Sequence, residues 1–154
     1  MLDQPVASIK NLRVEFATRS GTVVGVEDVS FDVHEGETVC IVGESGSGKS
    51  TLLSLICGTI IAQSGSVSVA GHSIASLSAG KRDRFRAEQI GLIFQQFNLL
   101  PFASVRDNIL LPLQFAPERR SRILNLNAEA KRRCRDLRLP DDVMTAQAGT
   151  LSVG

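Results

Sequence analysis

The sequence of 154 residues predicts an α/β fold built around a glycine-rich loop. An apolar run at residues 38–42 is typical of a buried strand, and it ends directly before a glycine-rich segment at residues 43–51. Leu52, Leu53 and Ile56 then recur at the spacing of a helix. A strand, a glycine-rich turn and a helix in direct succession favour an α/β architecture.

The glycine-rich segment matches the phosphate-binding pattern G-x-x-x-x-G-K-[ST]. Its glycines permit backbone angles that a Cβ forbids, so successive N–H groups can turn toward phosphate oxygens. The helix that follows adds the positive end of its dipole. We expect the lysine to reach the β- and γ-phosphates of a nucleoside triphosphate and the next serine to bind Mg²⁺. The expected binding residues are Gly43, Glu44, Ser45, Gly46, Ser47, Gly48, Lys49, Ser50 and Thr51.

Strands are predicted on both sides of the loop. Residues 9–33 alternate between apolar and polar side chains around a turn at residues 20–21, which predicts antiparallel strands. A shorter alternating run at residues 67–69 predicts a further strand. Residues 90–94 are apolar throughout, like residues 38–42, as expected of strands covered on both faces of a parallel sheet.

From residue 97 onward the pattern is helical, with Ser104 as a candidate N-cap. Residues 119–139 form a basic amphipathic stretch that holds nearly half of the chain's 17 positive charges. This stretch is interpreted as a solvated helix face, with a phospholipid- or partner-facing patch as the alternative. We therefore expect two partial domains, a nucleotide-binding α/β core with an antiparallel β subdomain at residues 1–96 and a helical subdomain at residues 97–154.

Composition and charge exclude several classes of function. With 17 basic and 16 acidic residues the chain lacks the excess of positive charge that binds nucleic acid without regard to sequence, so no nucleic-acid partner is expected. No apolar segment approaches the about 20 residues that span a bilayer, and the N-terminus lacks the features of a secretory signal. Cys40 and Cys57 fall on apolar elements and are interpreted as reduced packing residues of a cytosolic protein.

Two motifs follow one another along the chain. The first is the phosphate-binding loop, and the second is Ile-Gly-Leu-Ile-Phe-Gln-Gln-Phe-Asn-Leu-Leu-Pro at residues 90–101. Together they resemble the nucleotide-binding subunit of an ATP-binding cassette (ABC) transporter. The segments at residues 35–43 and 64–67 fit the same family. The similarity runs from about residue 8 to the last residue, and it is closest to the branch that serves lipoprotein release and macrolide or lipid-linked export.

The resemblance implies a P-loop NTPase of the ABC ATPase type that binds ATP and Mg²⁺. Gln95 matches the family's Q-loop glutamine, which touches Mg²⁺ and the attacking water; an exposed polar residue at a strand end is the alternative. Ser50 and Gln95 are then the expected metal ligands. Phe16 stands where the family stacks an aromatic ring on adenine, although its place in the alternation also suits a core residue.

The resemblance also implies partners and a location. Membrane permease subunits are expected, together with a second nucleotide-binding subunit in a homodimer or heterodimer. The implied location is cytoplasmic, peripheral on the cytoplasmic face of the membrane. In its complete form such a subunit hydrolyses ATP to drive export or the release of lipoproteins or lipids.

The last four residues depart from the family's pattern. The family has the signature Leu-Ser-Gly-Gly-Gln, which a partner subunit presents to the γ-phosphate; Leu151, Ser152 and Gly154 match it, and Val153 replaces a glycine. The branched Val side chain restricts the approach of backbone N–H groups to an anion. The family's later Asp-Glu pair, which holds Mg²⁺ and polarises water, does not occur. We therefore expect a truncated ABC ATPase that has no catalytic residue in the span present and is inactive by itself.

Other functions share part of this pattern. A small GTPase would need Asp-x-x-Gly and Asn-Lys-x-Asp, and neither occurs. A small-molecule kinase gives no reason for the Q-loop match. A non-transport ABC-type ATPase and a non-hydrolysing nucleotide-binding remnant remain open as alternatives.

Overall fold

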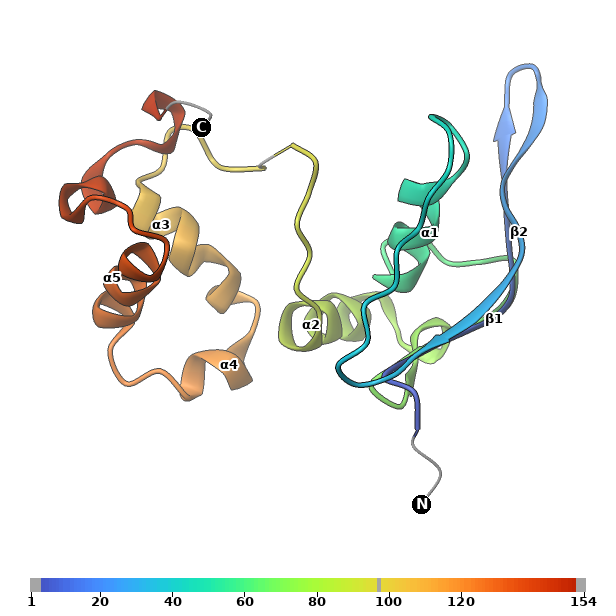
Figure 1. Cartoon of the computed structure of the whole chain (residues 1–154), viewed down its shortest axis with the longest axis horizontal. Coiled ribbons are helices and arrows are strands. Elements are labelled where there is room, and N and C mark those ends of the chain that lie inside the picture. The colour runs from blue at the N-terminus through green and yellow to red at the C-terminus, as the bar shows by residue number, and fades with distance from the viewer. Residues whose placement is uncertain (1–3, 97, 152–154) are drawn as a thin grey trace. The chain divides into compact units, whose positions relative to one another are not determined.

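The computed structural model describes residues 4–96 and 98–151. The chain forms two compact units, Met1–Gln89 and Ile90–Gly154 (Figure 1). The first unit contains a sheet with the helices α1 and α2, and the described residues of the second form helices, 3-10 turns and their connections. The boundary between these units falls between Gln89 and Ile90, seven residues before the domain boundary expected after residue 96. That expected boundary stays a prediction.

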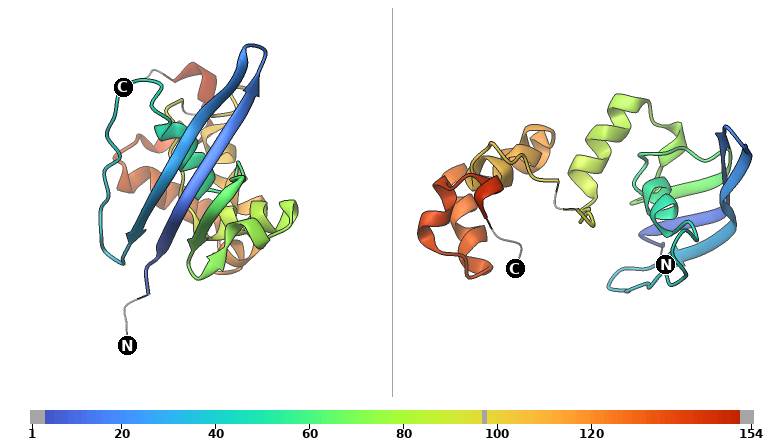
Figure 2. Two further views of the ribbon diagram at one scale, coloured as in Figure 1. Left: turned by 90° about the vertical axis from the view of Figure 1, so that its right-hand side faces the viewer. Right: turned by 90° about the horizontal axis from the view of Figure 1, so that it is seen from above.

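The sheet of the first unit is antiparallel, with the strand order β2-β1-β3-β4. The segment predicted from its alternating pattern forms a long hairpin of β1 and β2 that turns between Thr18 and Gly21. The short strand β3 pairs with the free edge of β1 (Figure 2). The strands are β1 (Ala7–Thr18), β2 (Gly21–Val33), β3 (Ser64–Val69) and β4 (His72–Ser73).

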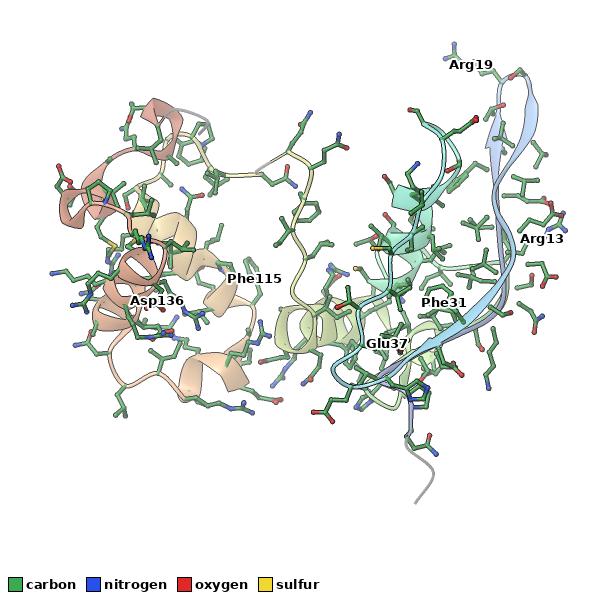
Figure 3. The ribbon with its side chains drawn as sticks, viewed as in Figure 1. Arg13, Arg19, Phe31, Glu37, Phe115 and Asp136 are labelled. Carbon is green, nitrogen blue, oxygen red and sulfur yellow. The ribbon has the colours of Figure 1, made fainter. Side chains whose placement is uncertain are left out.

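One face of this sheet is covered by α1 (Lys49–Ile56), the helix predicted after the loop. Leu52 and Leu55 of α1 are buried, as are Leu12 and Val14 of β1. On the opposite side of the hairpin from Phe31, Arg13 forms ion pairs with two glutamates of β1 and β2 (Figure 3). The burial of apolar groups between α1 and the sheet therefore fixes where the loop before α1 lies. The unit ends with a 3-10 turn (Ile74–Ser76) and α2 (Ala79–Gln89).

The two runs predicted as buried strands do not form strands. Residues 38–42 and 90–94 make no ladder with any strand in the described part of the chain, and Val42 and Ile93 are 91% and 97% exposed. A strand exists only through hydrogen bonds to neighbouring strands, and the four described strands pair with one another instead. Cys40, expected to pack, is exposed for the same reason, whereas Cys57 is buried as expected.

The second unit packs its helices around Val105, Ala130, Cys134 and Met144. The Oγ of Ser104 accepts a hydrogen bond from the Asp107 N–H at 3.0 Å, which confirms the predicted N-cap. No helix among residues 4–96 and 98–151 is both long and apolar enough to cross a membrane. The elements are α3 (Val105–Leu110), α4 (Pro117–Ser121) and α5 (Leu126–Asp136), with 3-10 turns at Leu111–Gln114, Asp141–Thr145 and Ala148–Thr150.

The predicted basic stretch covers α4 and α5, and its charges are partly paired within the helix. Glu129 accepts hydrogen bonds from Arg132 and Arg133, and these bonds and charges lower the pKa of Glu129 to about 2. Arg132 also contacts Asp136, one turn further along. The outer side of α5 thus carries an internal ion-pair network in solvent, where such pairs add little stability.

Candidate nucleotide-binding site

The glycine-rich loop forms a compact turn at the start of α1. Gly46 and Gly48 have φ values of +82° and +88°, which L side chains rarely adopt. The Ser47 N–H donates to the Glu44 carbonyl at 3.2 Å and closes the turn. A Cβ at Gly43 would come within 2.6 Å of the Ser47 Oγ, so a side chain there would require the Ser47 side chain to move. A loop of this kind can direct N–H groups at an anion.

Lys49 holds its positive charge against this loop. Its Nζ donates to the carbonyl oxygens of Gly43 and Glu44 at 2.8 and 2.5 Å, and it lies 3.3 Å from the Ser47 Oγ. These acceptors are neutral, whereas phosphate oxygens are charged and form stronger hydrogen bonds with an ammonium group. The loop and Lys49 together are therefore suited to a polyphosphate.

The loop rests directly on the backbone of β2. A Cβ at Gly48 would lie 2.1 Å from the Gly25 carbonyl oxygen, so only glycine permits this approach. A Cβ at Gly25 would in turn lie 2.6 Å from the Phe16 ring and 3.3 Å from the Thr51 Cγ2. The structure thus brings Phe16 of β1 beside the first turn of α1, with 37% of the residue exposed. A ring in this place is available for stacking, and it also contributes to packing.

Sequence reasoning missed Gly25 as a part of this arrangement. It lies inside β2, between Val24 and Val26. An isolated glycine within a strand is a known signal of close approach by another backbone, and this signal could have identified it.

The remaining predicted residues belong to the second unit. Gln95 is exposed and follows residues 90–94, and Leu151 is 43% exposed after the last 3-10 turn. Ser152 and Gly154 lie outside the described residues. The roles predicted for these four residues stay predictions.

The described residues at this site offer a hydroxyl group as a candidate ligand for Mg²⁺. The residues that the structure describes contain no group of three or more His, Cys, Asp or Glu side chains that could bind a metal. Ser50 is exposed at the start of α1, one residue after Lys49. A hydroxyl group there, completed by phosphate and water oxygens, fits the preference of Mg²⁺ for hard oxygen ligands.

An apolar groove opens beside the loop. It has a volume of about 370 Å³ and lies between β2, residues 39–42 and α1. Val29 and Phe31 of β2 line one side, and Val39 and Leu52 contribute to the others. The groove is continuous with the exposed run at residues 38–42, so the phosphate-binding loop borders an apolar surface.

Comparison with known proteins identifies the family. The family model described as ABC transporter matches residues 26–154. The chain belongs to the ABC transporter family. An uncharacterised ABC transporter ATP-binding protein of Mycobacterium tuberculosis is 40% identical over 113 residues, which cover 73% of this chain and 46% of that protein. The macrolide export ATP-binding/permease protein MacB of Psychrobacter arcticus is 37% identical over 74% of this chain and 17% of its own length.

Solved ABC cassettes share the fold. The dimeric structure of an ATP-binding cassette in a post-hydrolysis state, bound to ADP and Pi, matches with a TM-score of 0.82 and 26% identity. The match covers 95% of this chain and 63% of that one. The predicted fold class, an ABC-type P-loop NTPase with an antiparallel β part and a helical part, is therefore confirmed. The chain spans less than half the length of the curated relatives named above.

The position of Phe16 predicts a selective loss of affinity. Phe16→Ala is expected to weaken ATP binding about five- to tenfold, because a stacked ring contributes about 1 kcal/mol. Inorganic triphosphate has no base, so its affinity should not change. Calorimetric titration of both ligands measures the difference, with Phe16→Tyr as a control that keeps the ring and should bind ATP normally. Equal losses for ATP and triphosphate would show that Phe16 acts only through packing against Gly25.

Proposed function

We propose that this chain supplies the ATP-binding part of an ABC transporter subunit that binds ATP with Mg²⁺. The single observation that carries the proposal is the loop of residues 43–51, whose glycine-dependent turn and inward Lys49 suit a triphosphate. The match to relatives named as ATP-binding proteins, and to a cassette bound to ADP and Pi, supports adenine nucleotide as the ligand.

The proposed reaction is hydrolysis of ATP by the complete cassette. The complete cassette is a subunit that contains residues 1–154 together with a segment equivalent to the part of the solved cassette outside the match. In it, Lys49 neutralises the β- and γ-phosphates, and Ser50 and Gln95 bind Mg²⁺. Acidic residues outside the present span activate the water. Phosphoryl transfer depends mostly on such positioning and charge stabilisation.

We further propose that the complete cassette pairs with a second nucleotide-binding subunit and with membrane permease subunits. The dimeric cassette structure supports the first partner, and the fused permease of the MacB relative supports the second. The energy of ATP would then drive export or the release of lipoproteins or lipids, from a position on the cytoplasmic face of the membrane. Leu151, Ser152 and Gly154 would contact the ATP held by the other subunit.

Lys49→Ala tests the binding proposal most simply. ATP affinity of the complete cassette should fall below detection, because the substitution removes the charge paired with the β- and γ-phosphates and leaves α1 intact. Fluorescence or calorimetric titration measures this. Lys81→Ala, which removes an exposed lysine of α2, is the matched control and should bind ATP normally. Unchanged ATP affinity in Lys49→Ala would contradict the assignment of the loop.

Gln95→Ala tests the catalytic part of the proposal. The substitution should leave ATP binding unchanged and lower the turnover of the complete cassette, since it removes a proposed ligand of Mg²⁺. Steady-state phosphate release measures turnover, and Gln96→Ala, at the neighbouring exposed position, is the control. Hydrolysis at the parental rate in Gln95→Ala would show that the glutamine has no such role.

A further inference from the structure

One side chain fixes the shape of the loop at residues 100–104. The Oδ1 of Asn108 accepts a hydrogen bond from the Leu100 N–H at 2.8 Å. Its Nδ2 donates to the Leu100 carbonyl at 3.1 Å and to the Ser104 carbonyl at 3.0 Å. The amide of Asn108, in α3, therefore binds both backbone groups of Leu100 at one end of the loop and a carbonyl at the other. Partly buried hydrogen bonds of this kind leave unsatisfied backbone groups when they are lost.

This loop is bonded to the segment that leads to Leu151. The Ala148 N–H donates to the Ala103 carbonyl at 3.0 Å, and the Gly149 N–H donates to the Pro101 carbonyl at 2.9 Å. The Val105 N–H donates to the Ala146 carbonyl at 2.9 Å. We call the two paired segments, residues 100–105 and 146–149, the clasp.

The backbones of the clasp approach closely at Gly149. A Cβ at this position would lie 2.9 Å from the Pro101 carbonyl oxygen and 3.0 Å from the Pro101 Cβ. Neither contact can be relieved by a flexible side-chain end, because the atoms belong to the backbone and to a proline ring. The clasp therefore has one tight register, which a change in the shape of residues 100–104 would disturb.

The clasp sets the position of the first signature residue. Only Thr150 separates Gly149 from Leu151. Both residues after the clasp are held by the 3-10 turn, because the Thr150 N–H donates to the Gln147 carbonyl and the Leu151 N–H donates to the Ala148 carbonyl. A displacement of Ala148 or Gly149 is thus carried directly to Leu151.

We infer that Asn108 is a positioning residue that holds the clasp in register, so that Leu151, the first residue of the predicted signature, is presented correctly to the ATP of a second subunit. The inference rests on the proposed function for the ATP contact. The hydrogen bonds from Asn108 to the loop, and from the loop to residues 146–149, stand independently of it.

The test compares Asn108→Ala with Asn125→Ala in the complete cassette. Asn108→Ala should lower kcat about tenfold or more, as expected for an interaction needed in the transition state, and should change KM by less than about twofold. The Ala148 and Gly149 amides should also exchange their hydrogens faster. Asn125→Ala removes another asparagine of the second unit, whose Oδ1 accepts from the Ala128 N–H at 3.0 Å. It should change neither kcat nor exchange in the clasp.

A second variant keeps the inference testable if Asn108→Ala does not fold. Gly149→Ala disturbs the clasp from its other segment and should likewise lower kcat with little change in KM. Parental turnover together with faster exchange of Ala148 and Gly149 would overturn the inference, as would unchanged exchange in Asn108→Ala. If the parental cassette hydrolyses no ATP, the proposed function fails, and the exchange measurement still decides whether Asn108 holds the clasp.

Discussion

The close approach of two backbones, at Gly48 and Gly25, is the constraint on which the first unit depends. The phosphate-binding loop lies against β2 at a distance that no Cβ at Gly48 would permit. Because α1 starts at the next residue, this contact also sets where α1 enters the core and where Lys49 points. The same glycine of β2 makes room for the Phe16 ring, so the candidate base-stacking position and the phosphate loop share one support.

The second unit uses the same principle in a different place. Gly149 allows residues 146–149 to lie against residues 101–105, and Asn108 replaces the regular hydrogen bonds of a sheet or helix in the irregular loop beside them. In the first unit the loop at residues 43–51 is fixed by the contact of Gly48 with β2, and in the second the loop at residues 100–104 is fixed by the contact of Pro101 with Gly149. Rigid support of this kind is what a site needs if its groups are to act on a transition state.

The sequence predicted the parts of this protein that local patterns determine. The loop of residues 43–51, the hairpin, α1 and the Ser104 cap are all set by neighbours in sequence, and the structure contains each of them. Residues 38–42 and 90–94 were wrong as buried strands because an apolar pattern indicates a need for burial but does not supply the pairing partner. Gly25 was missed because its importance arises from contacts with Gly48 and Thr51, far away in the sequence. Asn108 was missed because its partners, though near in sequence, lie in an irregular loop that no periodic pattern predicts.

We expect the loop to bind phosphate only while it rests on β2, and two glycine variants separate this contact from the general cost of a side chain at positive φ. Gly48→Ala and Gly36→Ala place the same methyl group at similar φ values, +88° and +77°, but only Gly48 faces a neighbouring backbone, whereas nothing lies within 4 Å of a Cβ at Gly36. Calorimetric titration of the complete cassette with Mg²⁺ and inorganic triphosphate reports the phosphate site alone. Affinity is expected to fall about tenfold or more in Gly48→Ala and to change by less than about twofold in Gly36→Ala. Parental affinity in Gly48→Ala, or equal losses in both variants, would contradict this expectation.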